Sequence, residues 1–127
     1  MADVNRGNRP LSPHLSIYRP QLSMITSITH RITGVGLTLG LVLVVGWFLA
    51  ASTGPETFAI ADAVLTSWFG ALILIASLWA LSFHFLNGIR HLVWDAGYGL
   101  ELETAQKTGI AVLVGSVVLT ALTLLVI

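Results

Sequence analysis

Near residue 90 the sequence places histidine, asparagine, glycine and aspartate at helical spacing. With 3.6 residues per turn, one helix face would carry the following side chains: His84, Asn87, Gly88, His91 and Asp95. A buried neutral imidazole can ligate haem iron without adding charge, and Gly88 would leave a flat surface where a macrocycle could lie close. Ionisable groups at membrane depth usually point into a bundle, so this face predicts a functional site.

The two histidines of this face lie at different depths. His84 and His91 are about two turns apart along the helix axis, and both project from the same face. Axial ligands approach one haem from opposite sides, so these two cannot ligate the same iron. His30 is expected level with His91 rather than His84, which places the second ligand on another polypeptide. For Arg90, His91 and Asp95 an alternative stays open, namely that they only mark where the helix leaves the bilayer.

A second polar cluster lies earlier in the chain. In a helix, Ser27 and Arg31 would stack one turn apart. A hydroxyl and a guanidinium that converge can donate hydrogen bonds to a quinone carbonyl or a haem propionate. The alternative is an ordinary basic flank of a membrane helix with a hydroxyl cap.

The composition indicates which elements position these residues. Of the 127 residues, 55% are apolar and only 9% are charged, against about 25% in typical soluble domains. The solvent for most of the surface is therefore expected to be membrane lipid. There is no cysteine, and the net charge is zero, which argues against nucleic acid as a partner. A metal would have to be bound through carboxylates or the four histidines, which are His14, His30, His84 and His91.

Three long apolar runs predict an all-α integral membrane bundle of three transmembrane helices. The spans are expected at about 32–51, 63–86 and 108–127, because about 20 helical residues cross the hydrocarbon core. The runs are continuous rather than alternating, which excludes a barrel. The chain thus divides into an N-terminal cytoplasmic or interfacial segment, 1–31, and a transmembrane domain, 32–127.

Loop charges predict the orientation of the bundle. The loop 52–62 carries acidic residues and no basic one. All six basic residues fall on the other side of the spans: Arg6, Arg9, Arg19, Arg31, Arg90 and Lys107. By the positive-inside rule the N-terminus is inside and the C-terminus outside. No signal peptide is evident, which favours a bacterial inner membrane over the mitochondrial inner membrane.

Three motifs carry a family resemblance: Arg9-Pro-Leu-Ser-Pro-His14-Leu-Ser-Ile-Tyr18, Ser27-Ile-Thr-His30-Arg31-Ile-Thr-Gly34 and His84-x-x-Asn-Gly-Ile-Arg-His91-Leu-x-Trp-Asp95. In this order, and with three spans, the chain resembles the cytochrome b-type large membrane anchor subunit of succinate dehydrogenase, respiratory complex II. The resemblance runs from about Arg9 to the end of the chain.

The resemblance implies partners and cofactors. Such a subunit pairs with a small membrane anchor subunit, and together they hold an iron–sulfur subunit and a flavoprotein subunit. Succinate is oxidised at FAD in the flavoprotein, and electrons pass through iron–sulfur clusters to ubiquinone. A haem b is shared between the two anchors. The chain is then a subunit of an enzyme complex with no catalytic residue of its own.

The resemblance also implies residue roles. His84 would be one axial haem ligand, and His30 and Arg31 would lie near the haem propionates. Ser27 and Arg31 would face the quinone, and Asp95 would assist protons or water there. No role is carried over for His91.

Other functions compete with this interpretation. The b-type cytochrome membrane subunit of another respiratory dehydrogenase is one, although it usually needs two haems and hence more membrane histidines. A haem-free structural membrane anchor is another. A small transporter fits poorly, because the spans hold no charges that could form a substrate path.

Overall fold

The computed structural model describes residue 13 and residues 16–127, and all regular structure in that part of the chain is helical. The elements are α1 (Leu22–Thr53), α2 (Pro55–Leu65), α3 (Trp68–Asp95) and α4 (Leu102–Val126). Within the described residues α1, α3 and α4 are long and apolar enough to cross a membrane. The expected all-α fold with three membrane helices is confirmed. Arg6, Arg9 and His14 lie outside the described residues.

The first long helix begins earlier than the apolar run that predicted it. α1 starts at Leu22, so the boundary expected between residues 31 and 32 falls inside a continuous helix. Polar residues do not interrupt it, because their hydroxyls bond the carbonyls of the same helix. Thr26 donates to the Ser23 carbonyl at 3.1 Å, and Thr33 donates to the Thr29 carbonyl at 2.8 Å.

The second expected span, 63–86, crosses a break between two helices. α2 ends at Leu65, and Ser67 caps α3 by accepting a hydrogen bond from the Gly70 amide at 3.2 Å. The joint is tight, since a Cβ on Gly70 would collide with the carbonyl oxygens of Val64 and Leu65. α3 then continues unbroken to Asp95 and carries the whole polar motif on one helix.

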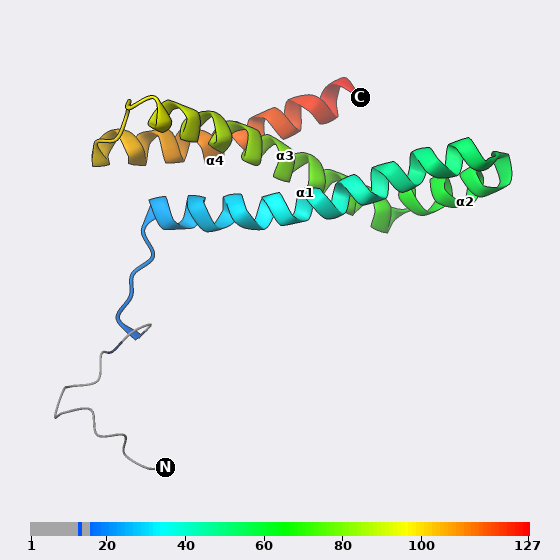
Figure 1. Ribbon diagram of the computed structural model, residues 1–127, viewed down its shortest axis with the longest axis horizontal. Coiled ribbons are helices and arrows are strands. Elements are labelled where there is room, and N and C mark those ends of the chain that lie inside the picture. Colours follow the sequence, from blue (N-terminus) through cyan, green and yellow to red (C-terminus); the bar gives the residue numbers. More distant parts are fainter. Residues whose placement is uncertain (1–12, 14–15) are drawn as a thin grey trace, which may run out of the picture.

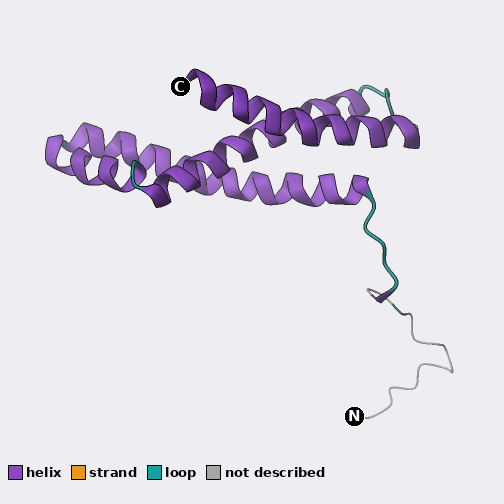
Figure 2. Cartoon of the chain, turned by 180° about the vertical axis from the view of Figure 1, so that it is seen from behind, coloured by secondary structure: helices purple, strands orange, loops and turns teal. Residues whose placement is uncertain are grey.

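The three long helices pack antiparallel in sequence order. Gly34 lies against His84, and Gly40 lies against Ser77, so α3 runs antiparallel to α1. α4 packs beside the C-terminal part of α3 (Figures 1 and 2). One end of the molecule therefore gathers the start of α1, the end of α3 and the start of α4. The other end holds α2, which is tied to α1 by the Trp47 indole donating to Asp62 at 3.2 Å.

Burial in this bundle is reversed relative to a soluble protein. The buried polar residues are Thr26, Thr33, Ser82, Asn87, Arg90, Ser116 and Thr120, whereas the buried apolar ones are Ala50, Ala80, Phe83 and Val112. Large apolar side chains cover the outside, such as Leu39, Val42 and Leu125. Small and polar residues between helices with aliphatic residues outside are typical of bundles in lipid, where packing and hydrogen bonds hold helices together.

Candidate functional site

The polar end of α3 presents two neighbouring faces rather than one. His84 and His91 lie against His30 of α1, and these three residues together with Gly88 of α3 form what we call the histidine face. Asn87 was expected on the same surface but is fully buried, and its side-chain oxygen accepts a hydrogen bond from Arg90 at 3.3 Å. The expected five-residue face is therefore divided, because Asn87 is buried beside Arg90.

The imidazole of His84 is held through one nitrogen. Its Nδ1 lies 3.1 Å from the carbonyl oxygen of His30 and 3.2 Å from Oγ1 of Thr33. The carbonyl can only accept, so the network assigns the proton to Nδ1. Nε2 is left with a free lone pair, and it takes part in no hydrogen bond with the described residues. Metal-ligating imidazoles in proteins commonly have this arrangement, in which the second ring nitrogen donates to a backbone carbonyl.

His30 lies against His84, not level with His91 alone as expected. The rings of His30 and His84 stack with centroids 3.8 Å apart and an interplanar angle of 12°, whereas His91 is 5.2 Å away. The expectation was wrong because α1 begins at Leu22, which puts His30 about two turns inside the helix. Ring lone pairs lie in the ring plane, so two stacked imidazoles cannot approach one iron from opposite sides.

The second predicted cluster lies at the edge of the histidine face. Ser27 and Arg31 flank His30 on α1, and Arg31 Nη2 donates to Ser27 Oγ at 3.5 Å, a long hydrogen bond. Arg31 is exposed, so most of its donors remain available. Asp95 is exposed at the end of α3 and makes no hydrogen bond with the described residues. The structure thus joins Ser27 with Arg31 but not with Asp95.

Arg90 is a buried residue whose role sequence reasoning missed. It is only 6% exposed, and its guanidinium links three helices. It donates to Thr26 of α1 at 3.3 Å, to Thr108 of α4 at 3.0 Å and to the Ala105 carbonyl at 2.7 Å. The position of Arg90 in the sequence could have indicated this burial, because a residue three positions after Asn87 lies beside Asn87 on the helix and away from the histidines. Arg90 marks no helix exit but a junction inside the bundle.

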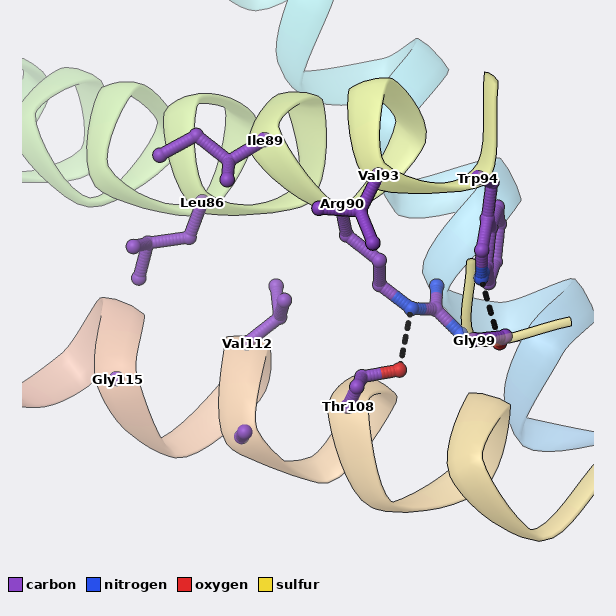
Figure 3. Close-up of a pocket in the computed structure, with 10 residues that line it drawn as sticks. Leu86, Ile89, Arg90, Val93, Trp94, Gly99, Thr108, Val112 and Gly115 are labelled. Carbon is purple, nitrogen blue, oxygen red and sulfur yellow. Dashed lines mark hydrogen bonds between the residues drawn. The ribbon is translucent and has the colours of Figure 1, made fainter. Parts of the chain in front are cut away.

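An apolar cavity lies beside this junction. Trp94 stacks on Arg90 with the guanidinium carbon 3.9 Å from the ring centroid, and its indole donates to the Gly99 carbonyl at 3.0 Å. The cavity, about 320 Å³, opens between α3 and α4 with Thr108 and Val112 on its far wall (Figure 3). No histidine among the described residues lines this cavity, but Trp94 connects it to the histidine face, because the indole packs edge-on against His91 with ring centroids 5.2 Å apart.

The fold and the site together define a class: a polytopic helical membrane protein with a cluster of histidines between two of its helices, among them His84 with an unbonded Nε2 and His30 with a buried, unbonded Nδ1. The chain belongs to the family of succinate dehydrogenase/fumarate reductase transmembrane subunits, whose profile matches residues 5–123. It is 60% identical to the succinate dehydrogenase cytochrome b556 subunit of Paracoccus denitrificans, over 99% of this chain and 97% of that protein.

Two further relatives are also named as cytochrome b subunits of succinate dehydrogenase. The succinate dehydrogenase cytochrome b556 subunit of Rickettsia conorii is 40% identical, over 90% of this chain and 89% of that protein. The succinate dehydrogenase cytochrome b560 subunit of Reclinomonas americana is 41% identical, over 80% of this chain and 74% of that protein. The family resemblance carried by the sequence motifs is confirmed.

Proposed function

We propose that this chain is the large membrane anchor of a succinate:quinone oxidoreductase, where it contributes one axial ligand to a haem b and part of the ubiquinone site. The observation that carries the proposal is the imidazole of His84, which is fixed at Nδ1 and free at Nε2. The names of the relatives, cytochrome b556 and b560 subunits of succinate dehydrogenase, support it. The partners would be a small membrane anchor, an iron–sulfur subunit and a flavoprotein that carries FAD.

The residues present fit a haem. His84 supplies a neutral nitrogen donor, and the surface beside Gly88 is open, because a Cβ there would meet no atom within 4 Å. His30 stacks on His84 and is poorly placed to bind the same iron, so a second ligand would come from the small anchor. The haem, when bound, supplies one-electron transfer. On this chain His84 would hold the iron, and His30 and Arg31 would lie near the propionates.

The quinone site would use the donors at the edge of the same face. A ubiquinone head group carries carbonyl oxygens that need hydrogen-bond donors, and Ser27 and Arg31 provide them side by side. Arg31 also stabilises the negative charge that develops on a carbonyl oxygen as the quinone is reduced. Asp95, exposed at the end of α3, would exchange protons with water near the site. We place the chain in a bacterial inner membrane, with these residues on the cytoplasmic side.

The proposal is tested by the absorption spectrum of the assembled complex. His84→Leu removes the free imidazole nitrogen, so the low-spin b-type spectrum in reduced-minus-oxidised difference measurements should be lost or strongly shifted. His91→Leu is the matched control on the same helix face and should keep a low-spin haem. A low-spin spectrum that depends on His91 and not on His84 would refute the ligand assignment.

Co-purification separates the alternative functions. A haem-free structural anchor predicts no b-type signal in the purified complex. The subunit of another respiratory dehydrogenase predicts a b-type signal without succinate-reducible flavin. Only the proposed function predicts that the chain co-purifies with a flavin-containing and an iron–sulfur-containing subunit that succinate reduces.

A further inference from the structure

The imidazole of His84 is enclosed by a second residue of α1 that has no assigned role. Thr33 is 4% exposed, and its Oγ1 lies 3.2 Å from Nδ1 of His84. On the neighbouring side of the ring, a Cβ on Gly34 would come within 3.1 Å of the Cε1 atom of His84. The ring therefore fits between a hydroxyl oxygen and a bare stretch of helix backbone.

The chemistry of Thr33 permits one kind of bond to His84. A hydroxyl has one hydrogen to give, and Thr33 Oγ1 lies 2.8 Å from the Thr29 carbonyl and 3.0 Å from the His30 carbonyl. Whichever carbonyl takes that hydrogen, the lone pairs of Oγ1 remain for the N–H of His84. The proton on Nδ1 is thus shared between two acceptors, the His30 carbonyl oxygen and the Thr33 hydroxyl oxygen.

We propose that Thr33 is a positioning residue for the haem ligand, which fixes the tautomer and ring plane of His84 and strengthens Nε2 as a donor. The inference rests on the proposed role of His84 as an axial ligand. Acceptors at the second ring nitrogen raise the basicity of a metal-bound imidazole. A more basic ligand favours ferric over ferrous iron, so Thr33 should hold the haem midpoint potential low. Thr33 itself needs no contact with the haem.

The test is a redox titration of the haem in the assembled complex. Thr33→Val keeps the shape of the side chain and removes the oxygen, so the haem should remain low-spin with a raised midpoint potential. Thr33→Ser restores the hydroxyl and should return the wild-type potential. The matched control is Thr38→Val, because Thr38 is exposed and makes the same kind of bond within α1, to the Gly34 carbonyl at 3.1 Å. Its potential should be that of the wild type.

The results of this titration distinguish a positioning role of Thr33 from a purely structural one. An unchanged potential in Thr33→Val, or an equal shift in Thr38→Val, overturns the proposal. If the valine variant retains no haem, the serine variant decides: the wild-type potential supports the proposal, and a shifted or missing haem overturns it. If the proposed function itself were wrong, a different result would show it, because the His84→Leu variant would then keep the low-spin haem.

Discussion

At the scale of residues, the donors that remain unused on an exposed side chain determine what it can bind. Ser27 accepts one long hydrogen bond from Arg31 and keeps its own hydrogen, and Arg31 keeps most of its N–H groups. The pair can therefore present several donors to one acceptor without rearrangement of α1. The two residues differ in the strength of the hydrogen bonds that they can donate, since bonds from a charged donor contribute about 1.5–3 kcal/mol and neutral ones about 0.5–1.5 kcal/mol.

Arg31→Leu should accordingly impair quinone reduction more than Ser27→Ala does. In the proposed site the arginine interaction would strengthen as negative charge develops on the quinone oxygen, whereas the serine would contribute a single neutral hydrogen bond. The measurement is paired: succinate–quinone activity and succinate–dye activity on the same assembled complex. The dye reaction should survive in both variants, because the proposed function places succinate oxidation in the partner subunits. Equal loss of both activities would mean that the residues serve assembly.

At the scale of elements, one buried arginine connects all three long helices. The guanidinium of Arg90 lies on α3 and bonds Thr26 of α1 and both Thr108 and the Ala105 carbonyl of α4. These bonds lie at the end of the bundle that also carries the histidine face. We therefore expect this junction to contribute to the spacing of α1 from α3, on which the contact of His30 with His84 also depends.

Arg90→Leu should therefore destabilise the bundle by on the order of 3 kcal/mol, because it removes charged hydrogen bonds and leaves buried acceptors unpaired. The check is the thermal denaturation midpoint of the purified complex in detergent. Lys107→Gln is the control, since its bond to Glu103 at 2.7 Å is an exposed pair within one helix and should contribute under about 1 kcal/mol. Comparable midpoints for the two variants would contradict a junction role for Arg90.

At the scale of the whole molecule, charge is distributed unevenly between the two ends. Arg31, Arg90 and Lys107 lie at the end formed by the start of α1, the end of α3 and the start of α4. The opposite end carries Glu56 and Asp62 on α2 and no basic residue among those described. By the positive-inside rule we expect the basic end to face the cytoplasm and α4 to carry the C-terminus to the outer side.

A reporter enzyme fused after Ile127 should therefore be active only if it works outside the cytoplasm, in the periplasm of a bacterial host. A fusion within the loop between α3 and α4 serves as control and should show the opposite behaviour. Cytoplasmic activity of the C-terminal fusion would contradict the arrangement of three spans.

The sequence by itself determined that the chain is a membrane helical bundle and which segments hold its candidate site. With 9% charged residues and continuous apolar runs, only lipid-exposed helices satisfy the backbone, so no tertiary information is needed for that conclusion. Helical periodicity likewise placed His84 and His91 on one face, because it depends only on rotation per residue. The spacing of motifs was enough for the family.

Only the tertiary structure decided which residues of different helices meet. The register of α1 against α3 depends on where α1 begins. The apolar run does not reveal that start, because the polar residues between Leu22 and Arg31 are also helical, with hydroxyls that bond carbonyls of their own helix. The stacking of His30 on His84 and the contact of Thr33 with Nδ1 follow from that register. The burial of Arg90 follows from the packing of α4 on α3. Helical periodicity determines the direction in which a side chain points from its own helix. Which residue of the neighbouring helix it meets is determined by the close packing of small and polar residues between the helices.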